Sequence, residues 1–80
     1  RHKIDEIDKT VESLILERAR QAMEVAKVKK SEEGNATMYR PEREQAILRK
    51  VLERNDGPIS DGNMEEIFRL IMSACLDVEK

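Results

Sequence analysis

Residues 3–30 read KIDEIDKTVESLILERARQAMEVAKVKK, and the length of this stretch decides the fold. The stretch contains no Gly or Pro, and Gly34 is the first glycine that follows it. Apolar residues recur through it at helical spacing, namely Ile4, Ile7, Val11, Leu14, Ile15, Ala22, Val25 and Val28. The pattern predicts one uninterrupted helix from Lys3 to Lys30.

A helix of about 28 residues is roughly 42 Å long, because each residue adds 1.5 Å. A compact globule of 80 residues has a radius of gyration of only about 12 Å. The rest of the chain is therefore too short to cover the apolar stripe of this helix. A second copy of the chain is the simplest cover, and an antiparallel two-fold pairing of the long helices closes the assembly.

Two shorter helices account for most of the remaining sequence. The second is predicted to start at Pro41, a favoured first-turn residue, and to stop at the turn sequence NDGP, residues 55–58. Ser60 or Asp61 is expected to cap the third. The apolar stripe of the second helix contains Ile47, Leu48, Val51 and Leu52, and that of the third contains Met64, Ile67, Phe68, Ile71, Met72, Cys75 and Val78. The segment SEEGNATMY, residues 31–39, has the composition of a connection. No stretch alternates like a strand, so we predict an all-α domain spanning residues 1–80, alone or within a longer chain.

The charge pattern argues against nucleic acid as a partner. Charged residues make up 40% of the chain, but the net charge is only -2 and the two signs are mixed along the sequence. Tyr39 and Phe68 are the only aromatic residues, whereas proteins that bind single strands need several stacking platforms. The pattern is typical of a solvated surface.

The sequence also argues against a disulfide, a metal site, a membrane span and a secretory signal. With one Cys and one His, the chain has no internal disulfide and no zinc-ligand pattern. No apolar run approaches the roughly 20 residues of a membrane span, and the start RHK does not lead into a secretory signal. We therefore predict a cytoplasmic protein that binds neither a metal nor a membrane.

Each predicted helix interrupts its apolar stripe with charge. Arg18 lies on the line through Val11 and Val25, and Lys29 follows Arg18 by three turns. Stepping the stripe of the second helix back by one turn leads to Arg43 and Glu44, and Glu79 ends the stripe of the third. Any one of these residues is more often a rim residue than a ligand. Together they predict a polar pocket between three helices that holds an anion, because unpaired charges are costly to bury.

Arg1 adds a geometric constraint. It precedes Arg18 by about 25 Å along a straight helix, so the two residues of one chain cannot bind the same small molecule. In an antiparallel pair, Arg1 of one chain approaches the segment from Arg18 to Lys29 of the other. Each site would then be built by two protomers.

Four segments resemble one known family when taken together. The sequences RHKIDEID, ERARQAMEVAKVKK, YRPEREQAIL and IFRLIMSACLDVE stand in the order and at the spacing of the all-helical chorismate mutases. The resemblance is greatest to the mutase domains of bifunctional enzymes that also carry prephenate dehydratase. It implies an intertwined antiparallel homodimer of three-helix chains with shared active sites. It also implies conversion of chorismate to prephenate, in phenylalanine and tyrosine biosynthesis, without a metal or organic cofactor.

The resemblance assigns the substrate carboxylates to cationic side chains. Arg18, and Arg1 from the partner chain, resemble the two arginines that bind these carboxylates. Lys29 resembles the lysine that contacts a carboxylate and the ether oxygen. Arg40 matches a position in the connection that approaches the substrate hydroxyl through its backbone.

The remaining matches concern the second and third helices. Arg43 and Glu44 resemble the charged pair of the second helix, with the glutamate accepting a hydrogen bond from the ring hydroxyl. Glu79 matches a Gln or Glu beside the ether oxygen. Cys75 stands where many members have serine, and a thiol is a weaker donor than a hydroxyl.

Two other functions remain open at this point. An isochorismate-pyruvate lyase resembles the same fold and also uses a cationic pocket. A non-catalytic dimerisation module would use Arg18, Lys29 and Glu79 only for ion pairs between helices.

Overall fold

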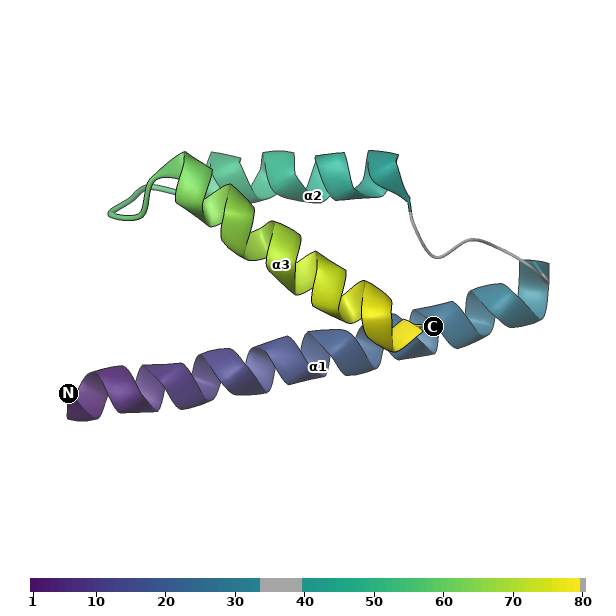
Figure 1. The fold of residues 1–80 in the computed structure, drawn as a ribbon, viewed down its shortest axis with the longest axis horizontal. Helices are drawn as coiled ribbons and strands as arrows, with labels where there is room; N and C mark the ends of the chain where they lie inside the picture. The colour runs from purple at the N-terminus through teal and green to yellow at the C-terminus, as the bar shows by residue number, and fades with distance from the viewer. Residues whose placement is uncertain (34–39, 80) are drawn as a thin grey trace.

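The computed structural model describes residues 1–33 and 40–79, with side chains placed for residues 1–28 and 40–79. This part of the chain forms three helices, α1 (His2–Glu33), α2 (Pro41–Arg54) and α3 (Asp61–Glu79) (Figure 1). None of the described residues lies in a strand. The prediction of an all-α chain with one long and two shorter helices is therefore confirmed, as is the start of α2 at Pro41.

The predicted end of the first helix was wrong by one turn. Ser31, Glu32 and Glu33 were assigned to the connection, whereas the structure continues α1 through them to Glu33. The physical reason is that none of the three is a helix breaker, and the first strong break in the sequence is Gly34. Gly34 and the rest of the predicted connection to Tyr39 lie outside the described residues.

Helix α3 joins the other two helices. It runs diagonally, with its start beside α2 and its last turns beside the second half of α1 (Figure 1). The chain measures 47 × 25 × 16 Å and has a radius of gyration of 14.7 Å, against the roughly 12 Å of a compact globule of this size. The first half of α1 lies away from the other two helices (Figure 1).

The core is small and lies where α3 crosses its two neighbours. Its buried residues are Ala26 from α1, Leu48 and Val51 from α2, and Met72 and Cys75 from α3. Ala26 was absent from the predicted stripe, whereas Val25, which was included, is 52% exposed. The small, buried side chain of Ala26 allows α3 to pack closely on α1. Helix packing therefore shifts the buried line of α1 by one residue.

Side chains fix the turn between α2 and α3. Asn55 donates from Nδ2 to the carbonyl of Ile59 at 3.0 Å and to Oδ1 of Asp61 at 2.8 Å. Ser60 accepts a hydrogen bond at Oγ from the backbone N–H of Asn63 at 3.1 Å. Of the two predicted caps for α3, Ser60 is thus the one that satisfies a free N–H group of the first turn.

Two glycines near this turn provide a matched stability test. Gly57 has a φ of +80°, which side chains with a Cβ adopt only with strain, whereas Gly62 lies inside α3 with open space around its Cβ position. We expect Gly62→Ala to raise the free energy of unfolding by about 0.5–1 kcal/mol and Gly57→Ala to lower it by about 1 kcal/mol. Urea unfolding followed by circular dichroism at one protein concentration measures both. Equal effects of the two substitutions would contradict the assigned backbone.

The long helix leaves most of its apolar stripe uncovered. Ile4, Ile7 and Leu14 are each at least 60% exposed, and Val11 and Val28 are about half exposed. No described helix is both long and apolar enough to cross a membrane. A second copy of the chain was predicted to cover this exposed stripe.

Candidate functional site

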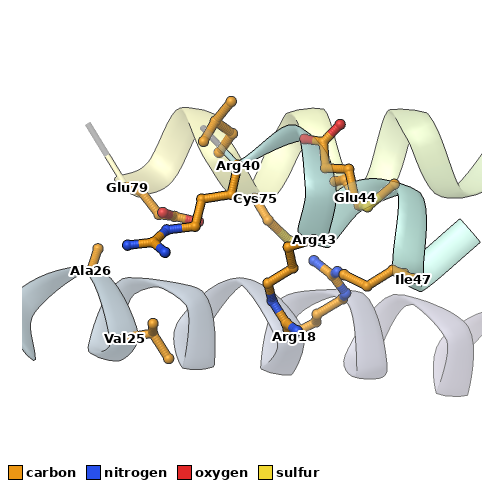
Figure 2. Close-up of a pocket in the computed structure, with 11 residues that line it drawn as sticks. Arg18, Val25, Ala26, Arg40, Arg43, Glu44, Ile47, Cys75 and Glu79 are labelled. Carbon is orange, nitrogen blue, oxygen red and sulfur yellow. The ribbon is translucent and has the colours of Figure 1, made fainter. Parts of the chain in front are cut away.

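A pocket of about 120 Å³ lies where the three helices meet, and both charged and apolar side chains line it (Figure 2). The charged group consists of Arg18, Arg40, Arg43, Glu44 and Glu79. The apolar group consists of Val25, Ala26, Ile47, Met72, Cys75 and Leu76. The fold therefore brings together six of the eight residues predicted for the site, although they lie far apart in the sequence.

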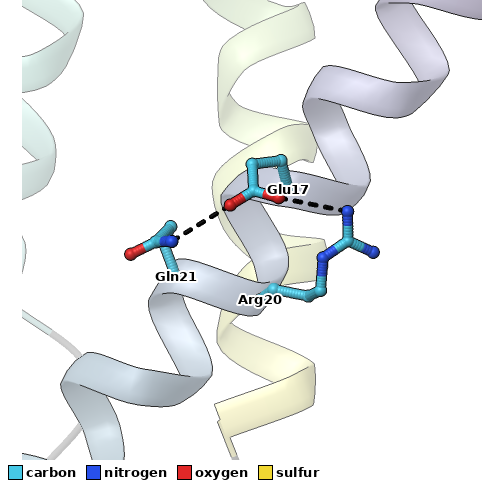
Figure 3. Close-up of polar contacts among 3 residues, drawn as sticks. All are labelled: Glu17, Arg20 and Gln21. Carbon is cyan, nitrogen blue, oxygen red and sulfur yellow. Dashed lines mark hydrogen bonds and ion pairs between the residues drawn. The ribbon is translucent and has the colours of Figure 1, made fainter.

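Helix α1 supplies Arg18 and keeps the nearby Arg20 out of the pocket. Arg20 donates from an Nη to Oε1 of Glu17 at 3.2 Å, and Gln21 donates to Oε2 at 3.0 Å (Figure 3). These hydrogen bonds hold the pKa of Glu17 below its usual value, and the bond from Gln21 has a larger effect than the bond from Arg20. The stability that the ionised Glu17 gives to α1 is present at pH values above the pKa of an unfolded glutamate. It is lost as the pH falls through the lowered pKa of Glu17 in the folded state. Arg18 projects from another side of the helix, half-buried, into the pocket.

Two arginines converge on one part of the pocket. Arg43 extends from α2 toward α1, and Arg18 extends from α1 to meet it (Figure 2). Neither guanidinium makes an ion pair with another described residue. Two like charges that face one another without a counter-ion favour an anion between them.

The first turn of α2 places two more charged groups. Arg40 is the N-cap, in an extended conformation with φ -132° and ψ 92°, and its carbonyl accepts a hydrogen bond from the N–H of Glu44 at 3.1 Å. This backbone conformation directs the half-buried side chain of Arg40 into the pocket. The carboxylate of Glu44 lies apart from the guanidinium groups of Arg18 and Arg43 (Figure 2). Glu44 can therefore accept a hydrogen bond from another part of a bound molecule.

Helix α3 contributes one wall and one charge. Met72 and Cys75 are buried beneath the pocket, and the thiol of Cys75 is free. Glu79, one turn after Cys75, is half-buried at the rim. Charged Glu79 and apolar Cys75 thus line the pocket from successive turns of the same face of α3.

Two predicted residues are not placed in this pocket. Arg1 is exposed at the start of α1, far from the pocket in the same chain (Figure 1). Lys29 lies in the last part of α1, but its side chain is outside the described residues. The contributions of both residues remain predictions.

Sequence reasoning missed part of the apolar lining. Ala26 and Leu76 were not singled out, although both line the pocket. Leu76 directly follows Cys75, and Ala26 follows Ala22 by one turn, so only the helix packing identifies them. Within the described residues, no group of His, Cys, Asp and Glu is arranged to hold a metal ion.

Comparisons with known proteins agree along the whole chain. The family model described as "Chorismate mutase type II" matches residues 1–80. A bifunctional chorismate mutase/prephenate dehydratase from Stutzerimonas stutzeri is 47% identical over 100% of this chain, which spans 23% of that protein. Proteins of the same name from Pseudomonas aeruginosa and Neisseria gonorrhoeae are 43% and 41% identical over the whole chain, which spans 23% and 21% of their lengths. The chain thus spans less than a quarter of these curated relatives.

Proposed function

The chain belongs to the chorismate mutase type II family, and from this premise we propose that it is an isomerase that rearranges chorismate to prephenate. The reaction is intramolecular: a C–O bond of the enolpyruvyl ether breaks while a C–C bond to the ring forms. It needs no nucleophile and no proton transfer, so the protein acts by holding the substrate's shape and by stabilising charge.

The convergence of Arg18 and Arg43 is the observation that carries this proposal. Chorismate has two carboxylates, one on the ring and one on the enolpyruvyl arm. Guanidinium groups bind carboxylates through paired hydrogen bonds in a fixed plane, which restricts how the arm rotates. Arginines from different helices therefore favour the folded conformer in which the reacting carbons approach one another.

The other polar groups suit the charge that develops in the reaction. Negative charge grows on the ether oxygen as the C–O bond lengthens. We propose that Lys29 and a protonated Glu79 donate hydrogen bonds to that oxygen, and that Glu44 accepts one from the ring hydroxyl. The apolar floor formed by Met72 and Cys75 excludes water and strengthens these interactions.

Product identification tests the proposed reaction. Incubation with chorismate, followed by proton NMR, should show the enol-ether methylene signals replaced by those of the pyruvyl side chain of prephenate. Isochorismate, supplied separately, tests the lyase alternative. Salicylate and pyruvate from isochorismate, with chorismate unchanged, would contradict the mutase and support the lyase.

We further propose that the working unit is an antiparallel homodimer with two shared sites, in the reducing cytoplasm that suits the free thiol of Cys75. The uncovered stripe on the first half of α1 provides the apolar surface. The signs are mixed over the whole chain, but within the first helix acidic residues outnumber basic ones in residues 5–12 and basic residues outnumber acidic ones in residues 18–30. This local difference supports the antiparallel direction. In this arrangement Arg1 of one chain lies near the Arg18 site of its partner.

Dilution tests the assembly. Because folding and association are coupled in such a dimer, we expect the thermal unfolding midpoint to rise by several degrees over a hundredfold increase in protein concentration. Light scattering at the same concentrations should give the mass of two chains. A monomer with a concentration-independent midpoint would contradict the dimer.

A further inference from the structure

The family resemblance assigns Arg40 only a backbone contact with the substrate, and it gives no role to the Arg40 side chain. This side chain lines the pocket, and its guanidinium reaches from the start of α2 toward the carboxylate of Glu79 at the end of α3 (Figure 2). We propose that Arg40 is a positioning residue for Glu79, which orients that carboxyl group and favours its ionised form. This inference rests on the proposed mutase function only for its kinetic consequence.

The local structure explains how Arg40 serves Glu79 from another helix. Arg40 precedes Pro41, which fixes the backbone at the first turn of α2 and restricts the residue before it to an extended conformation. The helix then starts with the Glu44 N–H bonded to the Arg40 carbonyl. A half-buried arginine with such a fixed backbone directs its charge more precisely than one on a flexible segment.

Several charged groups share the surroundings of Glu79, and their positions differ. In the main pocket these are Arg18 from α1 and Arg40, Arg43 and Glu44 from α2, with the Cys75 thiol on the same helix as Glu79. Lys27 from α1 lines a second groove with Glu79, and its Nζ lies 3.8 Å from Oε1 of Glu24. Arg18 and Arg43 extend toward one another, whereas Arg40 extends toward Glu79 (Figure 2). The geometry therefore singles out Arg40.

The sign of the effect follows from simple electrostatics. A neighbouring cation favours the carboxylate form, and the proposed donor role of Glu79 requires the protonated form. Removing the charge of Arg40 should therefore extend to higher pH the range in which Glu79 stays protonated. The pH at which kcat falls then moves upward.

A titration of the Glu79 carboxyl group measures the effect of Arg40 on its protonation without relying on enzyme activity. In protein labelled with ¹³C at glutamate side-chain carboxyls, the Glu79 signal is identified by its loss in Glu79→Gln. We expect Arg40→Gln to raise the Glu79 titration midpoint by about one pH unit, while Arg40→Lys keeps it within about 0.3 unit. Arg43→Gln, one turn along α2, and Lys27→Gln serve as matched controls and should leave it unchanged. An unchanged midpoint in Arg40→Gln, or a larger shift in either control, overturns the inference.

Kinetics with chorismate supply the second readout. The pH at which kcat falls should move upward by the same amount in Arg40→Gln, and this shift should vanish when Glu79→Gln is also present. A loss of activity that is the same at every pH and persists in the double variant would contradict the positioning role. If wild-type protein leaves chorismate unchanged, the proposed function fails, while the carboxyl titration still decides the coupling of Arg40 to Glu79.

Discussion

Replacing Arg18 by alanine is expected to lower kcat/KM for chorismate by about 10³-fold while the protein still folds. Arg18 is half-buried, lines the pocket and has no ion-pair partner among the described residues. Its removal therefore takes away one proposed charged donor to the substrate and breaks no ion pair within the described chain. Loss of one preorganised donor to developing or bound charge typically costs about 10²–10³ in rate, and loss of substrate binding adds to this.

Arg20→Ala provides the matched control from the same helix. Arg20 contacts Glu17 on the exposed side of α1, so its removal should change kcat/KM by less than about twofold. Steady-state kinetics, with thermal unfolding of each variant, measures both effects. An Arg18→Ala variant that unfolds more readily, together with a wild-type unfolding midpoint that chorismate leaves unchanged, would instead support the non-catalytic module.

Arg18→Ala also reveals whether two chains build each site. Arg1→Ala and Arg18→Ala homodimers should each be nearly inactive, because every site of either dimer lacks one arginine. After exchange of subunits, half of the dimers are mixed, and each mixed dimer has one intact site. We expect roughly a quarter of wild-type activity to return. Demonstrated exchange without recovery would rule out shared sites.

Replacing Glu79 is expected to produce the second large effect, and the replacement decides its form. Glu79→Ala removes the proposed donor to the ether oxygen and should lower kcat by about 10²–10³-fold at acidic pH. Glu79→Gln keeps a neutral donor of the same shape and should retain most of the wild-type maximum. The wild-type kcat should fall by up to about tenfold per pH unit once Glu79 ionises, because the carboxylate repels the charge on that oxygen, whereas the Gln variant stays flat.

The measurement is kcat and kcat/KM from about pH 4.5 to 8.5 for the three proteins, a range that starts near the ordinary titration of a glutamate. Glu66→Gln, an exposed change on the same helix, controls for a general loss of negative charge. A Gln variant that falls with pH as the wild type does would show that another group controls the profile.

The helices and their ends follow mainly from local chemistry, and for this reason the sequence predicts them. Pro41 pre-sets the first turn of α2, and the NDGP sequence stops it, whatever the rest of the chain does. The family could also be identified from sequence, because four segments resemble its members in order and spacing, and the family model matches the whole chain. The end of α1 was predicted three residues too early, because polar residues such as Ser31 and Glu33 are compatible with both helix and connection.

Helix packing decided what spacing along one helix cannot. Whether Val25 or Ala26 faces α3 depends on the crossing of two helices, which moves the buried line of α1 by one residue. The convergence of Arg18 with Arg43, and the reach of Arg40 toward Glu79, likewise depend on where α2 and α3 sit against α1. By itself the sequence determined which residues carry charge on an apolar face and which helices they occupy, because helical periodicity is a local property. Only the tertiary structure decided which of those charges meet, because that depends on contacts between segments far apart in the chain.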